Sequence, residues 1–336
     1  MKEFWKKKNV LITGINGFVG SNLAKKLINY NANVVGLIRN LNYKSLLFFE
    51  QINQKCLIVN GDLNNKDIIK RIIIENKIDI VFHLGAQVEV GLALKDPYET
   101  FETNIRGTYS LLNVINDYQH SIKSIIIASS DKAYGEYPKE KMPYRETYPL
   151  LPKFPYDTSK ACADMICNAY SIDQYGLPIV ITRFSNIYGP GQMNFSAIVP
   201  DGIRSALGYS TFIPRSDGSM VRDFIFSEDV VDLYMRIGKE LSLNPHKLRG
   251  EIFNAGSNDP IDMKSLLKKI YNFVDNYEDL KIILNHMKGK KTKGEIQHQH
   301  MSFDKVFDFF NWKPTHSIDE GIQKSINWYN KNLNKI

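Results

Sequence analysis

The sequence lacks several features that would place it in other large classes of protein. Its three cysteines, Cys56, Cys162 and Cys167, are odd in number and irregularly spaced, which argues against disulfides and against a zinc site. No apolar run is long enough to span a bilayer. The basic start of the chain leads directly into an apolar run, without the apolar core or cleavage site of a signal peptide. We therefore expect a soluble, cytoplasmic protein with no membrane partner.

A strong excess of charge of one sign is also missing. The net charge is +7 over 336 residues, and most lysines are scattered along the chain. This distribution is typical of solvated surfaces, so we expect no nucleic-acid partner and attribute the excess to attraction of a phosphate-bearing small molecule. His298 and His300 alternate in a polar segment without nearby carboxylate or cysteine partners, so we expect no metal site.

Short apolar runs alternate with longer amphipathic segments through the first half of the chain. This alternation is typical of parallel βαβ winding, and runs that are apolar throughout are expected where helices cover both faces of a sheet. The pattern predicts an α/β fold, a Rossmann-type doubly wound parallel sheet with a smaller mixed α/β lobe. The predicted strands are Val10–Thr13, Val34–Ile38, Cys56–Val59, Ile78–His83, Ile122–Ser129 and Pro178–Phe184.

The alternation weakens after Gly191, where short elements mix. Two later segments, Val221–Tyr234 and Glu251–Ala255, are interpreted as returns to the main sheet. We therefore predict a discontinuous main domain over residues 1–187 and about 221–256, and a second lobe over 188–220 and about 257–336.

A glycine-rich loop follows the first predicted strand and opens an amphipathic helix. In residues 13–20, TGINGFVG, the first glycine allows a tight turn and the second lets the backbone approach a pyrophosphate at the helix N-terminus. The third permits close packing of the helix on the sheet. A lone glycine triplet is weak evidence, but this strand–loop–helix context predicts a dinucleotide site. Its residues are Gly14, Asn16, Gly17, Phe18, Val19 and Gly20.

A tyrosine and a lysine share one face of a later predicted helix. Tyr156 and Lys160 are four residues apart, and a nearby ammonium favours the phenolate over a phenol whose ordinary pKa is about 10. The phenolate would take a hydroxyl proton while the carbon gives a hydride to a nicotinamide. Ser130, at the end of an apolar strand, would orient the substrate. The alternative is a surface tyrosine with a solvated lysine.

Together these motifs resemble the extended short-chain dehydrogenase/reductases, and among them the nucleotide-sugar epimerases and dehydratases. The resemblance runs from Val10 to about Tyr329. It implies that the main domain binds NAD(P), that the second lobe binds a nucleotide-diphosphate sugar, and that Asn104 is a structural asparagine beneath the active site. It also implies a homodimer or homotetramer, because the helices predicted at Tyr98–Gln119 and Tyr156–Tyr175 resemble the family's four-helix interface. The further cofactor contacts that it implies are Asp62, Leu63, Leu84 and Ala86.

The end of the second strand bears on the choice of cofactor. Arg39 lies there and no carboxylate does, and an arginine suits the 2′-phosphate of NADP whereas an acidic residue suits the ribose of NAD. We therefore favour NADP, with NAD as the alternative.

Asp131 and Lys132, which follow Ser130, separate two chemistries within this family. A 4-epimerase needs only oxidation, rotation and reduction, whereas a 4,6-dehydratase must also remove water across C5 and C6. Ser-Asp-Lys resembles the CDP-glucose 4,6-dehydratases. On this reading a protonated Asp131 gives its proton to the leaving hydroxyl and Lys132 takes the C5 proton. Lys132 would need a lowered pKa, because about 10.4 is too high for an efficient base at neutral pH. A solvent-facing dipeptide is the alternative.

Four residues of the second lobe are implied by the resemblance to contact the substrate. Arg222 suits a diphosphate because a guanidinium offers a fixed fork of donors. The alternative for each single assignment is a salt bridge at the domain interface. The four are Asn186, Val199, Arg204 and Arg222.

We therefore predict a hydro-lyase, a nucleotide-sugar 4,6-dehydratase that makes a 4-keto-6-deoxy sugar nucleotide for deoxysugar and polysaccharide biosynthesis. The first alternative is a 4-epimerase, and a remoter one is a non-catalytic NADP-binding regulator. A GDP-sugar or CDP-sugar is favoured as substrate, because residues 36–39 resemble GDP-mannose dehydratases and residues 130–132 resemble the CDP-glucose enzymes.

Overall fold

The computed structural model describes residues 1–118, 122–290 and 296–336. The predicted helix end at Gln119 and part of the polar segment before His298 lie outside these ranges. The chain divides into two compact units. The first contains Met1–Gly135, Glu146–Arg183 and Val230–Asn254, and the second contains Glu136–Arg145, Phe184–Asp229 and Ala255–Ile336.

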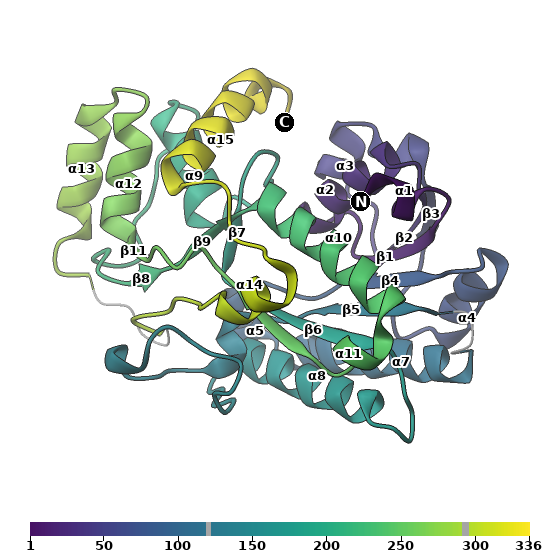
Figure 1. The fold of residues 1–336 in the computed structure, drawn as a ribbon. Coiled ribbons are helices and arrows are strands. Elements are labelled where there is room, and N and C mark those ends of the chain that lie inside the picture. Colours follow the sequence, from purple (N-terminus) through teal and green to yellow (C-terminus); the bar gives the residue numbers. More distant parts are fainter. Residues whose placement is uncertain (119–121, 291–295) are drawn as a thin grey trace. The chain divides into compact units, whose positions relative to one another are not determined.

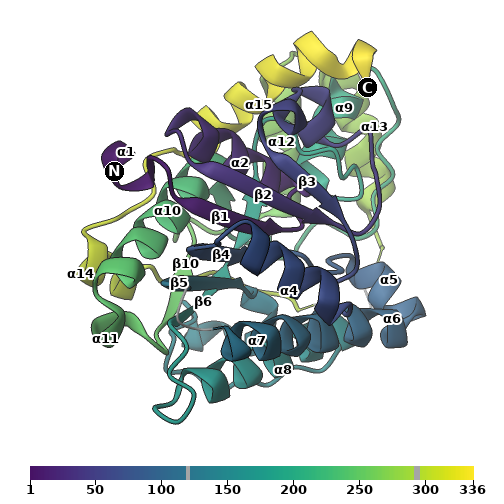
Figure 2. The same cartoon turned by 90° about the vertical axis from the view of Figure 1, so that its right-hand side faces the viewer.

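The first unit is built on a seven-stranded sheet with the order β10-β6-β5-β4-β1-β2-β3 (Figure 1; all seven strands are labelled in Figure 2). The pairings from β3 to β6 are parallel, which confirms the predicted Rossmann-type α/β fold. The strands are β1 Asn9–Thr13, β2 Asn33–Ile38, β3 Leu57–Asn60, β4 Ile80–His83, β5 Ser124–Ala128, β6 Ile179–Phe184 and β10 Ile252–Ala255.

Helices cover both faces of this sheet, as its uniformly apolar strands require. On one face α4, α7 and α8 enclose a core of aliphatic side chains that includes Val81, Leu111 and Ile125 (Figure 2). On the other face Phe82 packs between Trp5 and Tyr234, with ring centroids 6.1 and 6.0 Å away. The helices of this unit are α1 Lys2–Trp5, α2 Phe18–Asn29, α3 Leu46–Phe49, α4 Lys66–Glu75, α5 Val90–Lys95, α6 Pro97–Phe101, α7 Gly107–Asp117, α8 Pro155–Ser171, α10 Ser227–Leu243 and α11 Pro245–Leu248.

The helix predicted as one piece from Tyr98 is interrupted. A π-helical turn over Glu102–Arg106 separates α6 from α7. Such turns are frequent at functional sites, and this one contains Asn104. Hydrophobic periodicity alone does not reveal a π turn, because the insertion shifts the pattern by only one residue.

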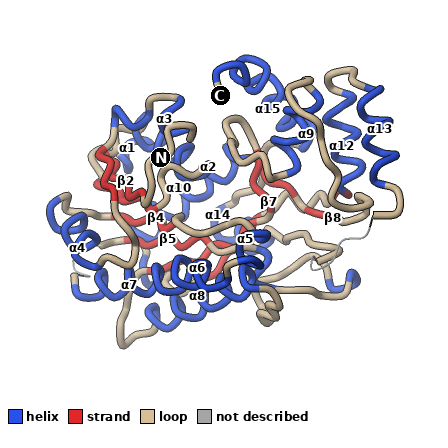
Figure 3. The backbone as a smooth tube through the Cα atoms, turned by 180° about the vertical axis from the view of Figure 1, so that it is seen from behind, coloured by secondary structure: helices blue, strands red, loops and turns tan. Residues whose placement is uncertain are grey.

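The second unit is mainly helical with two short two-stranded sheets (Figure 3). Helix α12 packs against α9 and α13, where Leu267, Ile270 and Tyr271 join the core of the unit. Helix α15 begins with a capping box between Ser317 and Glu320. The elements are β7 Asn186–Tyr188, α9 Ile198–Ala206, β8 Val221–Arg222, β9 Phe224–Phe226, β11 Ile261–Asp262, α12 Met263–Asn272, α13 Tyr277–Met287, α14 Asp304–Phe310 and α15 Ile318–Asn332.

The predicted return of Val221–Tyr234 to the main sheet is wrong. Strand β8 pairs antiparallel with β11, and β9 pairs in parallel with β7. The apolar residues from Val230 onward belong to α10, whose first turn carries Glu228 and Asp229 as a helix start favours. Of the two predicted returns, only the segment ending at Ala255 joins the main sheet, as β10. Within the described ranges, no helix combines the length and apolar character needed to cross a bilayer.

Candidate active site

The glycine loop lies at the carboxyl end of β1, against the loop that follows β4. Gly14 has a φ of +69°, and a Cβ on it would lie 2.7 Å from the Cα of Gly85. A Cβ on Gly20 would lie 2.4 Å from the Gly14 carbonyl oxygen, so α2 packs directly onto the loop. Gly17 is the N-cap residue of α2, and the first turn of this fully described helix contains no acidic residue. The loop and helix start therefore fit the pyrophosphate of a dinucleotide.

The other predicted cofactor residues lie in the first unit, after neighbouring strands. The Asn16 side-chain amide donates to the Asn40 carbonyl at 3.1 Å. Asp62 accepts from the backbone N–H of Asn64 at 2.7 Å, and Leu63 lies beside Gly85. Parallel sheets bind ligands at this edge, where the carboxyl ends of the strands meet. Phe18 and Val19 begin α2, and Leu84 and Ala86 lie in the loop after β4.

Arg39 follows β2 but is not a solitary cation. Its guanidinium forms an ion pair with Glu99 of α6 and also donates to the Thr103 hydroxyl at 3.2 Å. Both members of the pair are about half exposed. A carboxylate therefore stands beside the arginine from which a preference for NADP was predicted.

The predicted catalytic residues come together where β5 ends and α8 begins. Tyr156 and Lys160 lie in the first turns of α8 and are 7% and 6% exposed. The Lys160 ammonium donates to the carbonyl oxygen of Ala128, the last residue of β5, at 2.8 Å. Ser130 caps a short 3₁₀ helix over Asp131–Tyr134, which packs against α8.

Burial dominates the electrostatics of the Tyr156–Lys160 pair. It lowers the pKa of Lys160 to about 8, although Asp164 and Cys167 act in the opposite direction. It raises the pKa of Tyr156, and the negative charges of Asp131 and Asp157 add to that rise while a hydrogen bond with Ser130 opposes it. The lowered phenol pKa predicted from the spacing is therefore wrong for this structure, because desolvation of the buried phenol is the largest effect on its pKa and raises it.

Asp131 is turned into the protein rather than toward solvent. The residue is 5% exposed, and its carboxylate accepts a hydrogen bond from the Ser130 hydroxyl at 2.9 Å. The backbone N–H of Lys132 donates to the same hydroxyl at 3.3 Å, and the Lys132 side chain is half-buried. The reading of these residues as a solvent-facing dipeptide does not hold for Asp131.

Asn104 joins the active-site helix to the loop after β4. Its amide nitrogen donates to the Ser159 hydroxyl at 2.9 Å and to the Gln87 carbonyl at 3.0 Å, and its oxygen accepts from the Gln87 N–H at 2.8 Å. Ser159 in turn donates to the Tyr156 carbonyl at 2.7 Å. The sequence analysis identified Asn104 as structural but missed Ser159 and Gln87, for which spacing gives no signal.

The predicted substrate residues all lie in the second unit. The Asn186 side chain donates to the Asp223 carbonyl at 3.1 Å, and Arg222, 6% exposed, precedes Asp223 in the chain. Val199 and Arg204 share α9, where Val199 is buried. Arg204 is already engaged, because it pairs with Asp201 at 2.8 Å and stacks over the Phe195 ring at 4.3 Å.

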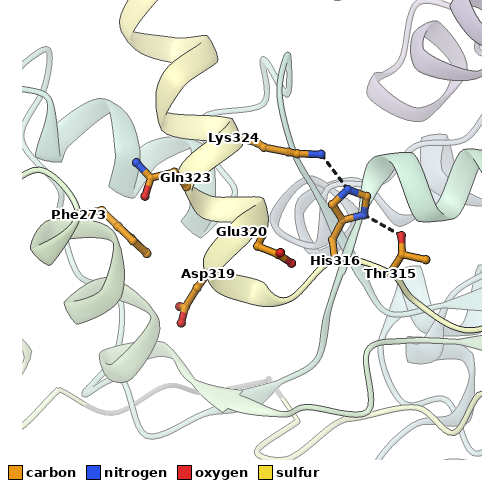
Figure 4. Close-up of a pocket in the computed structure, with 7 residues that line it drawn as sticks. All are labelled: Phe273, Thr315, His316, Asp319, Glu320, Gln323 and Lys324. Atoms are coloured by element: carbon orange, nitrogen blue, oxygen red, sulfur yellow. Dashed lines mark hydrogen bonds between the residues drawn. The ribbon is translucent and has the colours of Figure 1, made fainter.

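The second unit also contains a pocket of about 540 Å³ that none of the predicted residues lines (Figure 4). His316 forms one side, with Nδ1 3.0 Å from Asp229 and Nε2 2.8 Å from the Lys324 ammonium. Phe273, Gln323 and Asp319 form the other side. Several polar groups of this pocket are already hydrogen-bonded with one another. The site in the first unit therefore remains the candidate active site.

Comparison with known proteins identifies the family. Residues 11–325 match the model described as GDP-mannose 4,6 dehydratase. The chain is 30% identical to a trifunctional UDP-glucose 4,6-dehydratase/UDP-4-keto-6-deoxy-D-glucose 3,5-epimerase/UDP-4-keto-L-rhamnose-reductase of Arabidopsis thaliana, over 98% of this chain and 48% of the relative. The chain thus spans about half the length of this relative and of two others with the same activities in their names.

Two solved structures are similar over almost their whole length. One is dTDP-glucose 4,6-dehydratase from Bacillus anthracis in complex with NAD, with a TM-score of 0.81, 27% identity and 98% of both chains covered. The other is UDP-glucose 4-epimerase from Thermotoga maritima with UDP-glucose, with a TM-score of 0.83, 25% identity, and 97% of this chain and 99% of the other covered. With its family-model match over residues 11–325, the chain belongs to the GDP-mannose 4,6-dehydratase family, the nucleotide-sugar dehydratases and epimerases of the short-chain dehydrogenase/reductase type.

Proposed function

We propose that this protein is a nucleotide-sugar 4,6-dehydratase, which converts a nucleoside-diphosphate hexose into the 4-keto-6-deoxy sugar and water. A nicotinamide dinucleotide held by the glycine loop would accept the hydride of C4 and return it to C6. Tyr156, acting as the phenolate, takes the proton of the C4 hydroxyl, with the Lys160 ammonium beside it. The positive charge of the bound oxidised nicotinamide would have to offset the burial that raises the phenol pKa in the cofactor-free protein. Lys132 takes the C5 proton, and Asp131 gives a proton to the C6 hydroxyl, which leaves as water. Lys132 then returns a proton to C5, and the proton that Tyr156 gained passes to Asp131, so that each group regains its starting state and atoms and charge balance.

The observation that carries this proposal is the position of Asp131. Its carboxyl group is buried, hydrogen-bonded to Ser130, and close enough to Tyr156 for its charge to raise the pKa of that phenol. Oxidation at C4 requires only Tyr156 and Lys160. An additional buried carboxyl group next to them, followed by an amine, supplies the acid and the base that water loss requires.

Substitution of Asp131 and Lys132 tests this role. We expect Asp131→Asn and Lys132→Met each to lower the rate of water loss by about a hundredfold or more. The affinity for the dinucleotide should stay within about threefold, because neither residue is in the glycine loop. A 4-epimerase is the second candidate, since the Thermotoga maritima epimerase has the same fold. An epimerase would largely keep its activity in both variants, and NMR of the product would show a hexose isomer.

We infer that NAD, rather than the NADP favoured by the sequence, is the cofactor. The Glu99 carboxylate neutralises Arg39 and would repel a 2′-phosphate brought to the same place. The Bacillus anthracis dehydratase and its NAD complex support the same choice. Titration of the cofactor-free protein with both dinucleotides tests the inference directly.

The first unit is proposed to hold the dinucleotide and the second to bind the nucleotide sugar. The guanidinium of Arg222 offers a fixed fork of donors that suits a diphosphate. Asn186, and Val199 and Arg204 on α9, are the other residues proposed to contact the nucleotide sugar. The resemblance of residues 36–39 and 130–132 to known dehydratases favours a GDP- or CDP-hexose as substrate. The relatives described above carry UDP-glucose and dTDP-glucose in their names. Incubation with all four classes identifies the base, and Arg222→Met should raise the KM for the one that reacts.

We further propose that the protein forms a homodimer through α7 and α8, helices that lie side by side. Tyr109 on α7 and Met165 on α8 leave 40% and 63% of their surfaces exposed, and Ile172, the residue that follows α8, leaves 51% exposed. Exposed apolar side chains of this size favour burial against a second copy. Light scattering should give twice the 38.6 kDa of one chain, and Met165→Glu should reduce that mass toward the monomer.

A further inference from the structure

His83 ends β4 inside the sheet, and both of its ring nitrogens are engaged. Nδ1 lies 2.8 Å from the Thr13 hydroxyl at the end of β1, and Nε2 lies 3.0 Å from the Thr108 hydroxyl in α7. All three side chains are at most 3% exposed. The proposed reaction gives this imidazole no chemical step, although it connects two strands and a helix that carry the site.

The neighbouring hydrogen bonds determine which nitrogen carries the proton. The Thr108 hydroxyl donates its single hydrogen to the Asn104 carbonyl at 2.6 Å, so it can only accept from His83. Nε2 must therefore be the protonated nitrogen. The Thr13 hydroxyl accepts from the Gly85 N–H at 3.0 Å, which leaves its own hydrogen for the unprotonated Nδ1. Every donor and acceptor is used once only when His83 is neutral.

The charge state follows from the same surroundings. Burial, together with the smaller effect of the nearby Lys160 ammonium, lowers the pKa of His83 to about 3. A second proton on Nδ1 would also leave the Thr13 hydroxyl hydrogen without its acceptor. His83 is therefore held in one tautomer over the whole physiological pH range.

Each side of this ring leads to a part of the candidate site. Through Thr13, it fixes Gly85 against Gly14, the contact between the two loops proposed to hold the dinucleotide. Through Thr108, it reaches the Asn104 carbonyl, and the Asn104 side chain holds Ser159 in the turn of α8 that carries Tyr156. His83 is the branch point between these two chains of hydrogen bonds.

We propose that His83 is a positioning residue which, as a neutral imidazole protonated on Nε2, holds the dinucleotide loops in register with the helix that carries Tyr156. It contacts neither substrate nor reacting atoms in this role. The proposal depends on the proposed function in one respect, because it takes the loops that contain Gly14 and Gly85 to be the dinucleotide site.

Nitrogen NMR of the imidazole tests the tautomer without any turnover. In protein labelled with ¹⁵N at histidine, the His83 signals are assigned by their loss in His83→Phe. We expect Nδ1 to show the shift of an unprotonated nitrogen and Nε2 that of a protonated one, with no change between pH 5.5 and 8.5. A proton on Nδ1, or titration near the ordinary histidine pKa of about 6.5, would overturn the proposal.

Matched variants of Thr108 test the positioning role while His83 itself stays in place. Thr108→Val removes the acceptor of Nε2–H, whereas Thr108→Ser keeps it. We expect Thr108→Val to bind NAD about tenfold more weakly by titration calorimetry and to lose kcat by at least as much, with the KM for the nucleotide sugar within threefold. Thr108→Ser should restore both values. His246→Gln, an exposed histidine in α11, is the control and should match the wild type.

The outcomes separate this proposal from the proposed function. If wild-type protein binds NAD but forms no dehydrated product, only the dehydratase assignment fails, because the NMR and calorimetry remain interpretable. If Thr108→Val is folded at the assay temperature and binds NAD as tightly as wild type, His83 does not position the dinucleotide loops and the proposal is wrong.

Discussion

The hydroxyl of Ser130 donates a hydrogen bond of 2.9 Å to the carboxylate of Asp131, the next residue in the chain. The same hydroxyl acts on Tyr156, because it lowers the phenol pKa against the rise that burial causes. Ser130 therefore lies between the group proposed for oxidation at C4 and the group proposed for the loss of water. Asp131 and Tyr156 are buried and Ser130 is partly buried, so these groups are shielded in part from solvent.

Replacing Ser130 with alanine should impair turnover without impairing cofactor binding. We expect Ser130→Ala to lower kcat by about a hundredfold, in the range usual for loss of a group that assists proton transfer. The Kd for NAD should remain within threefold. Ser130→Thr keeps the hydroxyl and serves as the matched control, with most of the activity retained. Steady-state kinetics in which Ser130→Ala keeps at least a third of the wild-type kcat would contradict this role.

Lys160 should cost stability in the cofactor-free protein because its charge is buried. The folded-state pKa of about 8 lies below the unfolded value of about 10.4, a difference worth roughly 3 kcal/mol. Below pH 8 both states are protonated, and the full cost is present. Between pH 8 and about 10.4 the unfolded chain binds more protons, so stability rises with pH.

Lys160→Met should therefore be inactive but more stable. We expect a gain of about 1–2 kcal/mol at pH 7, smaller than the full cost because the hydrogen bond to Ala128 is lost. The gain should shrink toward zero as pH approaches 10. Urea unfolding of both proteins at pH 7 and pH 9.5 measures it. A variant that is less stable than wild type at pH 7 would show that the buried ammonium is a net stabilising group.

The Arg183–Asp164 ion pair lies beneath the active-site helix and should be sensitive to loss of one partner. Arg183 Nε lies 2.6 Å from Asp164 Oδ2, and the two side chains are 4% and 2% exposed. The Arg183 guanidinium also lies 4.7 Å from the centre of the Tyr134 ring. We expect Asp164→Leu to lower the free energy of unfolding by about 3–5 kcal/mol, because it leaves a buried charge unpaired. The double variant Asp164→Leu/Arg183→Met should be less destabilised than the single one. Equal stability of single and double variants in thermal unfolding would refute this explanation.

Glu99 should set the preference between the two dinucleotides. Wild-type protein is expected to bind NAD at least tenfold more tightly than NADP. Glu99→Gln should lower the ratio of the Kd for NADP to the Kd for NAD at least threefold. The substitution releases Arg39 and removes the repulsion of a 2′-phosphate. Arg39→Ala is the control and should not gain NADP affinity. Equal Kd values for the two dinucleotides in the wild type would contradict the inference.

The architecture could be predicted from the sequence where residue type and local geometry agree. The uniformly apolar strands and the glycines of residues 13–20 predict a doubly wound sheet with a phosphate loop, because few other structures accommodate both. The four-residue spacing of Tyr156 and Lys160 places them on one face of α8. These relationships involve residues that are close together in the chain. The sequence alone is therefore sufficient to predict them.

Long-range relationships could not be predicted in this way. Nothing in the spacing indicates that Glu99 reaches Arg39 across 60 residues, or that Thr13 and Thr108 meet His83. The rise in the Tyr156 pKa was missed for a related reason, because burial is a property of the whole unit and not of the Tyr–Lys spacing. The Val221–Tyr234 segment was misassigned because a short apolar run can be a strand or the buried face of a helix.

Mass spectrometry of the products in light and heavy water tests the dehydratase assignment most directly. Purified protein with NAD is incubated separately with CDP-, GDP-, dTDP- and UDP-hexoses, without added reductant. We expect one nucleotide sugar to lose one water, and in heavy water to gain one deuterium at C5, because the proton that Lys132 holds exchanges with solvent. An unchanged mass accompanied by a new hexose isomer in the NMR spectrum would contradict the roles given to Asp131 and Lys132.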